Sequence, residues 1–223
     1  MTVRISFARK GGRRQPVPPP FPTVAKSFDL AGATTAFSRN EEVFGEGEPA
    51  EYLYKVSSGC VRTYNTLNDG RRQIGGFYFP GDIFGLEARK LHTCSAEAIS
   101  RSRLQSIKLT ELVSRIPRGM VLNRLLLELT TDELQRTQSH ILLLLKSAQE
   151  RVIGFLLDMA ELEDSSSEIE LPMSRQDIAD YLGLTIETVS RTLTRLETAT
   201  TISLPSSRRV VLRDRQALSR LMN

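Results

Sequence analysis

Residues 172–197 read PMSRQDIADYLGLTIETVSRTLTRLE, and they predict how the C-terminal part of the chain folds. Ser174 followed three positions later by Asp177 is a capping box, so we expect a helix to begin there and to end at Gly183. Thr185 then caps a second helix, IETVSRTLTRLE. Two helices joined by a short turn that contains glycine are typical of the helix-turn-helix motif. The inward positions of the first helix are Ile178, Ala179 and Leu182.

The second predicted helix has two chemically different faces. At about 100° per residue, one face is apolar, and the other carries a carboxylate, hydroxyl groups and a guanidinium. The polar groups lie in the N-terminal half of the helix, where readers of the DNA major groove place their base contacts. The apolar stripe consists of Val189, Leu193 and Leu196, and the outward face consists of Glu187, Ser190, Arg191 and Thr194, with Ile186 at the border.

This outward face carries the side-chain types that recognise base edges. Arg191 can donate paired hydrogen bonds to guanine, and Glu187 can accept one from the amino group of cytosine. Ser190 can contact either kind of base, and Ile186 can contact a thymine methyl group. The other interpretation is that Glu187 and Arg191, four residues apart, form only a solvent-exposed ion pair. The preceding helix and turn favour base recognition.

The composition is that of an ordinary globular protein with a basic surplus. The 223 residues are 40% hydrophobic and 25% charged, with a net charge of +4. Residues 188–223 hold seven arginines and two acids, a net charge of +5, which fits a polyanionic partner. No apolar run is long enough to span a membrane, and Cys60 and Cys94 lack the spacing of a disulfide framework. We therefore expect a cytoplasmic protein.

A winged hairpin is predicted after the second helix. Residues 201–204 and 210–212 have the character of short strands, and Arg208 and Arg209 would lie at the tip between them. Both arginines are expected to contact backbone phosphates, which adds affinity rather than sequence specificity. The other predicted phosphate contacts are Ser174, Thr185, Thr188 and Arg195.

Residues 36–108 show a β pattern. Short apolar and aromatic runs, YLYKV, CVRTYNTL and QIGGFYF, are separated by turn signals. Gly47, Gly59, Gly70 and Gly81 recur every 11 or 12 residues, and Gly70 ends an Asn-Asp-Gly hairpin signal. We therefore predict a small antiparallel β-barrel.

A long helix is predicted after the barrel. Residues 120–145 contain neither glycine nor proline and would extend about 39 Å. An apolar seam with a seven-residue repeat, interrupted by threonines, predicts a parallel dimer helix. The other interpretation is a helix buried within one subunit. The predicted dimer seam consists of Leu127, Thr130, Leu134, Thr137, Ile141 and Leu144, and a second stripe, expected to pack on the barrel, consists of Leu122, Leu125, Leu126 and Leu129.

These patterns divide the chain into four segments. A further helix is expected at 147–162, followed by an acidic, serine-rich linker, EDSSSEIE, at 163–170. The absence of a glycine-rich phosphate loop and of metal-ligand spacing predicts that the protein is not an enzyme. The segments are a basic, proline-rich arm (1–27), the β-barrel (28–118), the dimerisation helix (119–146) and the winged helix-turn-helix (147–223).

This order of segments, together with EEVFGEGEPAEYLYKVSSGCVR (41–62), FYFPGDIFG (77–85) and ETVSR (187–191), resembles the Crp/Fnr superfamily of bacterial transcription factors. The resemblance covers nearly the whole chain after about Phe37, and ETVSR is similar to the E-x-x-S-R pattern of the Fnr and FixK groups. It implies an α+β fold: a jelly roll like those that bind cyclic nucleotides, a long dimerisation helix and a C-terminal winged helix-turn-helix.

For the FixK group, the resemblance implies a homodimer that binds palindromes of TTG and CAA half-sites in double-stranded DNA. Glu187, Ser190 and Arg191 are then the base readers, and Ile186 takes the position that contacts thymine. The implied regulator acts mainly as an activator, with RNA polymerase as a partner and the barrel as a scaffold. Its genes are those of microaerobic respiration or nitrogen fixation.

Two departures from the family pattern concern the small molecules or clusters that the protein could bind. Cyclic-nucleotide binders of the superfamily place an arginine before a serine in the barrel, whereas Cys94 takes that position here, with Arg89 and Lys90 as the candidate substitutes. Residues 1–59 contain no cysteine for an iron–sulfur cluster. We therefore expect no cofactor. The alternative is a ligand-gated regulator, for example one that binds haem through His92 and Cys94 or senses another small molecule.

Overall fold

The computed structural model describes residues 33–115, 120–162 and 167–222, so the predicted arm at 1–27 lies outside the described residues. The described residues belong to two compact units, 33–133 and 134–222, and the division falls within a single long helix, α3 (Met120–Leu144). Within the described ranges, no helix combines the length and apolar character needed to cross a lipid bilayer.

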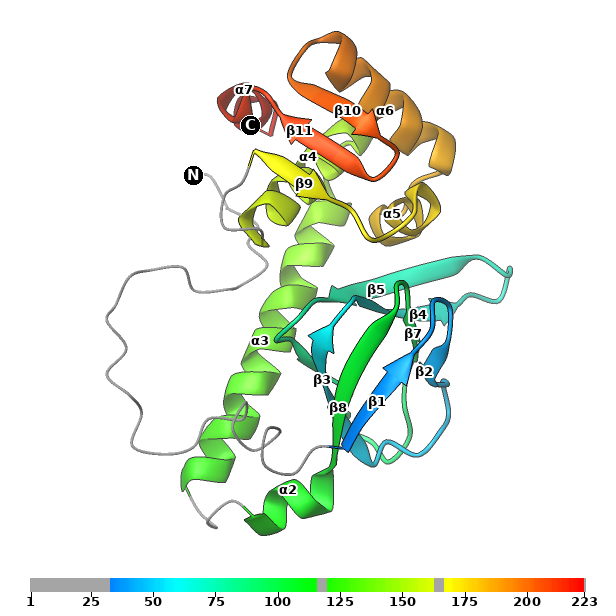
Figure 1. The fold of residues 1–223 in the computed structure, drawn as a ribbon, viewed down its shortest axis with the longest axis vertical. Helices are drawn as coiled ribbons and strands as arrows, with labels where there is room; N and C mark the ends of the chain where they lie inside the picture. The colour runs from blue at the N-terminus through cyan, green and yellow to red at the C-terminus, as the bar shows by residue number, and fades with distance from the viewer. Residues whose placement is uncertain (1–32, 116–119, 163–166, 223) are drawn as a thin grey trace. The chain divides into compact units, whose positions relative to one another are not determined.

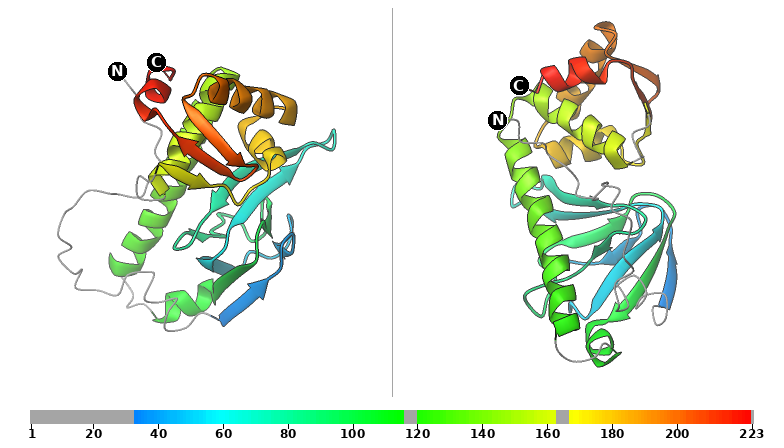
Figure 2. Two further views of the ribbon diagram at one scale, coloured as in Figure 1. Left: turned by 45° about the horizontal axis from the view of Figure 1, so that its top comes forward. Right: turned by 90° about the vertical axis from the view of Figure 1, so that its left-hand side faces the viewer.

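The N-terminal unit is a β-sandwich of two antiparallel four-stranded sheets, which face each other in Figure 2. One sheet has the strand order β1-β8-β3-β6 and the other β2-β7-β4-β5. The predicted antiparallel jelly roll is confirmed. The strands are β1 (Ala33–Phe37), β2 (Glu42–Phe44), β3 (Tyr52–Ser58), β4 (Val61–Thr66), β5 (Arg72–Tyr78), β6 (Ile83–Phe84), β7 (Ser95–Ala98) and β8 (Ser102–Lys108), and all of them except β6 are labelled in Figure 1.

The evenly spaced glycines lie in turns, as predicted. Gly47, Gly59, Gly70 and Gly81 all have positive φ, between 81° and 97°. Gly59 also permits a close approach, because a Cβ atom there would lie 2.3 Å from the hydroxyl oxygen of Ser102. Only glycine combines this conformation with this proximity.

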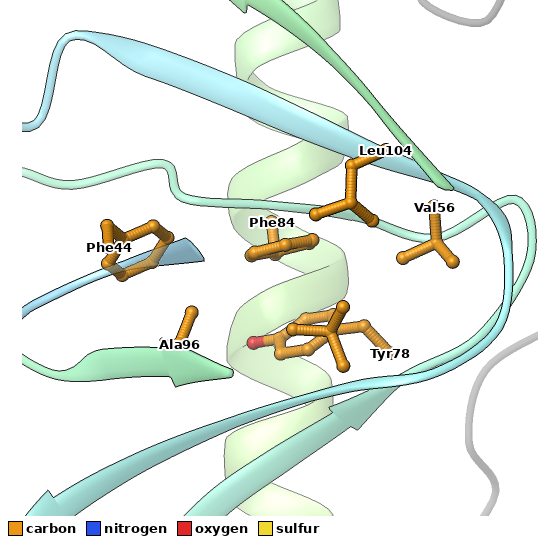
Figure 3. Packing of buried hydrophobic residues seen from close by; sticks show 7 residues of the cluster. Phe44, Val56, Tyr78, Phe84, Ala96 and Leu104 are labelled. Atoms are coloured by element: carbon orange, nitrogen blue, oxygen red, sulfur yellow. The ribbon is translucent and has the colours of Figure 1, made fainter. Parts of the chain in front are cut away.

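The interior of the sandwich is filled by side chains from both sheets. Figure 3 shows Phe44, Tyr78 and Phe84 converging between the sheets, together with smaller aliphatic side chains. The Tyr78 hydroxyl donates a hydrogen bond of 3.2 Å to Glu133 of α3. These side chains form a packed core between the two sheets. The buried cluster consists of Phe44, Val56, Val61, Tyr78, Phe84, Ala96 and Leu104.

Helix α3 follows a short helix, α2 (Leu109–Arg115). Leu129 of α3 packs against a cluster formed by Leu53, Ile107 and Leu112. This contact confirms the predicted packing of the second leucine stripe on the barrel for Leu129. The side chains of Leu122 and Leu125 lie outside the described part of the structure.

The C-terminal unit contains the predicted helix-turn-helix and a small three-stranded sheet of order β10-β11-β9. Glu168–Glu170 form β9, so the prediction that these residues belong to a linker is wrong. The run Glu-Ile-Glu alternates exposed and buried positions, and Ile169 is fully buried, which is a strand pattern over only three residues.

Helix α7 was not predicted. Asp214 caps it by accepting a hydrogen bond from the Ala217 amide at 2.8 Å, and Leu218 is fully buried. The elements of this unit, besides the end of α3, are α4 (Ala148–Leu162), β9 (Glu168–Glu170), α5 (Arg175–Leu182), α6 (Ile186–Thr198), β10 (Ile202–Ser206), β11 (Arg209–Leu212) and α7 (Arg215–Arg220).

Candidate DNA interface

The first helix of the motif, α5, begins and ends where the sequence predicts. The Ser174 hydroxyl accepts from the Asp177 amide at 3.1 Å, and the Asp177 carboxylate accepts from the Ser174 amide at 2.9 Å. At the other end, Gly183 adopts the left-handed conformation with φ of 61°. Two reciprocal hydrogen bonds and a glycine cap therefore fix the direction in which the chain enters the turn.

The second helix, α6, is anchored along its apolar stripe. Val189, Leu193 and Leu196 are each at most 3% exposed. Thr192 is also buried, and its hydroxyl donates to the Thr188 carbonyl at 2.8 Å, so it contributes packing without an unpaired polar group. Thr185 caps the helix by accepting a hydrogen bond from the Thr188 amide at 3.3 Å. One face of α6 is thus held by the fold, which leaves the opposite face open.

The predicted base readers lie together on this open face. Glu187 and Arg191 are exposed, Ser190 is half-buried, and Ile186 is 37% exposed. The backbone amide of Glu187 and the Thr185 hydroxyl hydrogen-bond to the Glu187 carboxylate and lower its pKa, while attraction to Arg191 is the smallest contribution. The carboxylate is therefore ionised at neutral pH, as an acceptor for a base amino group must be.

Some of the residues predicted to contact phosphates already form hydrogen bonds within the protein, and others are exposed. Arg195 is exposed near the end of α6, and Thr185 and Thr188 share a hydrogen bond of 3.2 Å at its beginning. The Ser174 hydroxyl also donates to Asp177 at 2.7 Å, so the capping box uses both of its hydrogen-bonding functions.

The wing differs from the prediction at one arginine. Strand β11 begins at Arg209, so Arg209 lies within the sheet and not at the tip. Its Nε forms an ion pair of 2.8 Å with Glu168 of β9. Arg208 does lie in the turn, but it is half-buried and its Nη1 donates to the Pro172 carbonyl at 3.3 Å. Glu168, the partner of Arg209, belongs to strand β9 and not to a linker.

The predicted dimer seam is largely exposed on α3. Leu127, Leu134 and Ile141 are 66%, 54% and 54% exposed, and the threonines at 130 and 137 are exposed as well. Leu144 differs, because it is half-buried beside Gly183 in the turn of its own subunit. Leu145, four residues after Ile141, is 78% exposed and was not included in the prediction. The exposed apolar stripe of α3 is therefore followed by an exposed leucine in the turn after the helix.

Two supporting residues were missed by the sequence reasoning. His140 of α3 is buried against α5, where its Nε2 lies 2.7 Å from the Tyr181 carbonyl oxygen. Arg151 of α4 donates to the Leu182 carbonyl at 2.9 Å. No sequence pattern indicates these contacts, because they join segments 31 and 41 residues apart.

In the described part of the barrel, the position expected to hold a phosphate-pairing arginine does not suit a cyclic phosphate. Cys94 stands where an arginine would pair the phosphate, and burial raises the pKa of its thiol to about 12, with further raising by the carboxylates of Glu87, Glu133 and Glu46. A phosphate placed here would meet negative charge instead of a guanidinium. Arg89 is exposed on the preceding loop, as is Lys90. The residues at this position do not fit a cyclic phosphate.

The histidine considered for haem is a core residue. His92 is 3% exposed, and its ring stacks on Phe44 with 3.6 Å between the ring centroids. Burial lowers its pKa although Glu87 lies 3.6 Å away, so the ring is neutral at physiological pH. Among the described residues, no group of three or more histidine, cysteine, aspartate or glutamate side chains is arranged to hold a metal ion.

A winged helix-turn-helix with an exposed polar helix face, joined by a long helix to a β-sandwich, defines a DNA-binding transcription regulator, and comparison with known proteins agrees. Residues 150–221 match the Crp-like helix-turn-helix domain, and residues 34–116 match the cyclic nucleotide-binding domain. The chain belongs to the Crp/Fnr family of transcription regulators and is FixK-like. It is not an enzyme.

Individual relatives are similar over most of their length. The nitrogen fixation regulation protein FixK of Azorhizobium caulinodans is 53% identical over 85% of this chain and 79% of that protein. FixK of Rhizobium meliloti is 39% identical over 84% of this chain and 86% of that protein. The solved structure of FixK2 from Bradyrhizobium japonicum is 44% identical and aligns with a TM-score of 0.83, covering 87% of this chain and 98% of that one.

Proposed function

We propose that the protein binds, as a homodimer, palindromes of TTG and CAA half-sites, and that Glu187, Ser190 and Arg191 read the bases. One observation carries this proposal: the three side chains lie together on the open face of a helix whose other face is buried. The carboxylate can accept a hydrogen bond from cytosine, and the guanidinium can donate to guanine. The hydroxyl between them can contact either kind of base. Ile186, partly exposed at the border, supplies a contact for a thymine methyl group.

The homodimer is supported by the apolar stripe on α3. Leu127, Leu134 and Ile141 expose large aliphatic side chains along one line of the helix, and Leu145, in the turn directly after the helix, is exposed as well. A second copy related by a twofold axis covers this line with the same residues, which makes the interface self-complementary. The same axis places the two recognition helices in successive major grooves about 34 Å apart.

The side chains inside the barrel support the proposal that the protein binds DNA without an effector. Its interior is occupied by Phe44, Tyr78 and Phe84, and Cys94 replaces the arginine that would hold a phosphate. The barrel then serves as a scaffold and as a contact surface for RNA polymerase, and activity is set mainly by the amount of protein. Relatives named for nitrogen fixation regulation support a role as activator of genes for nitrogen fixation or microaerobic respiration.

Binding of the untreated protein to a designed palindrome tests the proposal. The assay combines fluorescence anisotropy with sedimentation of the complex, so that affinity and stoichiometry come from the same sample. We expect two chains per palindrome and affinity several orders of magnitude tighter than for scrambled DNA of the same length. Equal affinity for both DNA molecules would overturn the proposal. Tight binding only after addition of a small molecule would favour the ligand-gated alternative.

A further inference from the structure

The C-terminal end of α5 is held by side chains from two other helices. His140 of α3 lies 2.7 Å from the Tyr181 carbonyl oxygen, and Arg151 of α4 donates to the carbonyls of Leu182 at 2.9 Å and Gly183 at 3.5 Å. The last carbonyls of a helix have no partner within the helix, so such donors are needed. Three successive carbonyls at the turn of the helix-turn-helix are therefore bound by two residues.

The side chains of His140 and Arg151 are also held by further contacts. The ring of His140 stacks on the ring of Tyr181, with 4.0 Å between centroids and an angle of 3° between planes. Arg151 uses its Nε to donate to the Lys146 carbonyl at 2.9 Å, in the corner between α3 and α4. Because a carbonyl only accepts, the Nε2 of His140 must carry the hydrogen. Each side chain thus joins α5 to the corner at which α3 ends.

The backbones around this corner are also close. A Cβ atom added to Gly154 of α4 would lie 2.8 Å from the Leu143 side chain of α3. Leu144 approaches Gly183 from the same end of α3, at 3.6 Å from the position of its missing Cβ. Packing of this kind leaves little freedom for the turn to tilt against α3.

We infer that His140 and Arg151, here named the carbonyl clamp, are positioning residues that set the direction of α6 relative to α3 and thereby the half-site spacing the dimer accepts. The inference rests on the proposed function. Ile141, next to His140, lies in the stripe that a second copy covers, so the clamp joins the dimer axis to the recognition helix within about one helical turn. Neither clamp residue needs to touch DNA for this effect.

Half-site spacing is a sensitive readout of this direction. Inserting one base pair between the half-sites moves the second site by about 3.4 Å along the axis and rotates it by roughly a tenth of a turn. A dimer with a fixed angle between α3 and α6 cannot meet both sites after that change. A dimer with a loosened clamp can, at the expense of affinity for the best site.

The experiment measures full-chain binding to three DNA molecules: the best palindrome, the same palindrome with one inserted base pair, and a single half-site. Arg151→Met keeps the aliphatic stem but removes every donor, and Arg151→Lys restores one. His140→Phe keeps the stacked ring and removes the donor. Arg220→Met, at an exposed arginine of α7, removes the same charge outside the clamp. Circular dichroism at the assay temperature verifies that each variant is folded.

We expect the wild type to prefer the best palindrome over the lengthened one by at least about tenfold. This preference should fall to about twofold or less in Arg151→Met and decrease in His140→Phe, with partial recovery in Arg151→Lys. Arg220→Met should keep the wild-type preference. Binding to the single half-site should change by less than about twofold in every variant, because the base-reading face is untouched.

Two outcomes separate the inference from the proposed function. If the wild type prefers its spacing and both Arg151→Met and His140→Phe keep that preference, the clamp has no positioning role and the proposed function stands. If the wild type shows no preference among the three DNA molecules, the proposed function itself fails. Should Arg151→Met not fold, His140→Phe and Arg151→Lys decide the question.

Discussion

Replacing Arg191 by alanine removes the guanidinium that the proposed function assigns to guanine. The side chain is exposed on the open face of α6, so its loss should change the free energy of unfolding by no more than about 0.5 kcal/mol. A bidentate contact to guanine is worth about 1 to 3 kcal/mol of discrimination, which is a loss of roughly 5- to 150-fold for each half-site. The palindrome has two such sites, so the full complex should lose the product of two of these factors.

The assay compares the palindrome with variants in which one G·C pair per half-site is replaced, and with scrambled DNA. Arg191→Ala should bind the replaced palindrome almost as well as the original, because the contact that distinguished them is gone. Arg195→Ala, which removes a predicted phosphate contact on the same helix, should weaken binding to all three DNA molecules alike. An equal loss on specific and scrambled DNA for Arg191→Ala would refute the base-reading assignment.

Three further predictions concern stability and assembly. Ile141→Glu places a charge in the exposed stripe of α3 and should yield monomers in sedimentation equilibrium, whereas a dimer that persists would contradict the proposed seam. Ser174→Ala should lower the free energy of unfolding by about 1 kcal/mol in denaturant titrations, since it breaks the capping box; no change would show that the box contributes nothing. Burial raises the pKa of Asp158 well above 3.8, so above that pH the unfolded state releases a proton that the folded state retains. The folded state therefore loses stability as pH rises from about 4 toward the raised pKa, and Asp158→Asn should gain stability relative to the wild type between about pH 4 and pH 7. A constant difference across this range would contradict the raised pKa.

Short local signals account for the parts that the sequence predicted correctly. The capping box at Ser174 and Asp177 and the left-handed Gly183 are determined by residues three to nine positions apart, so they can be recognised without knowing the fold. The glycines of the barrel turns are recognisable for the same reason. The apolar stripe of α6 follows from helical periodicity alone. Because this stripe is buried, Glu187 and Arg191 lie on the opposite, open face of the helix.

The errors and omissions concern contacts between distant segments. Strand β9 has only three residues, and nothing local separates them from the acidic run before them. Its pairing with β11 removed Arg209 from the wing tip. Leu144 and Leu145 are both apolar, so the heptad pattern does not show which of them is exposed. In the structure Leu144 lies beside Gly183 and is half-buried, whereas Leu145 is 78% exposed.

Selection of bound sites from random double-stranded DNA, with purified protein and no added ligand, tests whether a dimer reads the bases without an effector. We expect enrichment of one twofold-symmetric sequence with TTG and CAA half-sites whose centres are about one helical turn apart. Enrichment of a single unpaired site, of a sequence unrelated to the Glu187, Ser190 and Arg191 chemistry, or of nothing above background would contradict it.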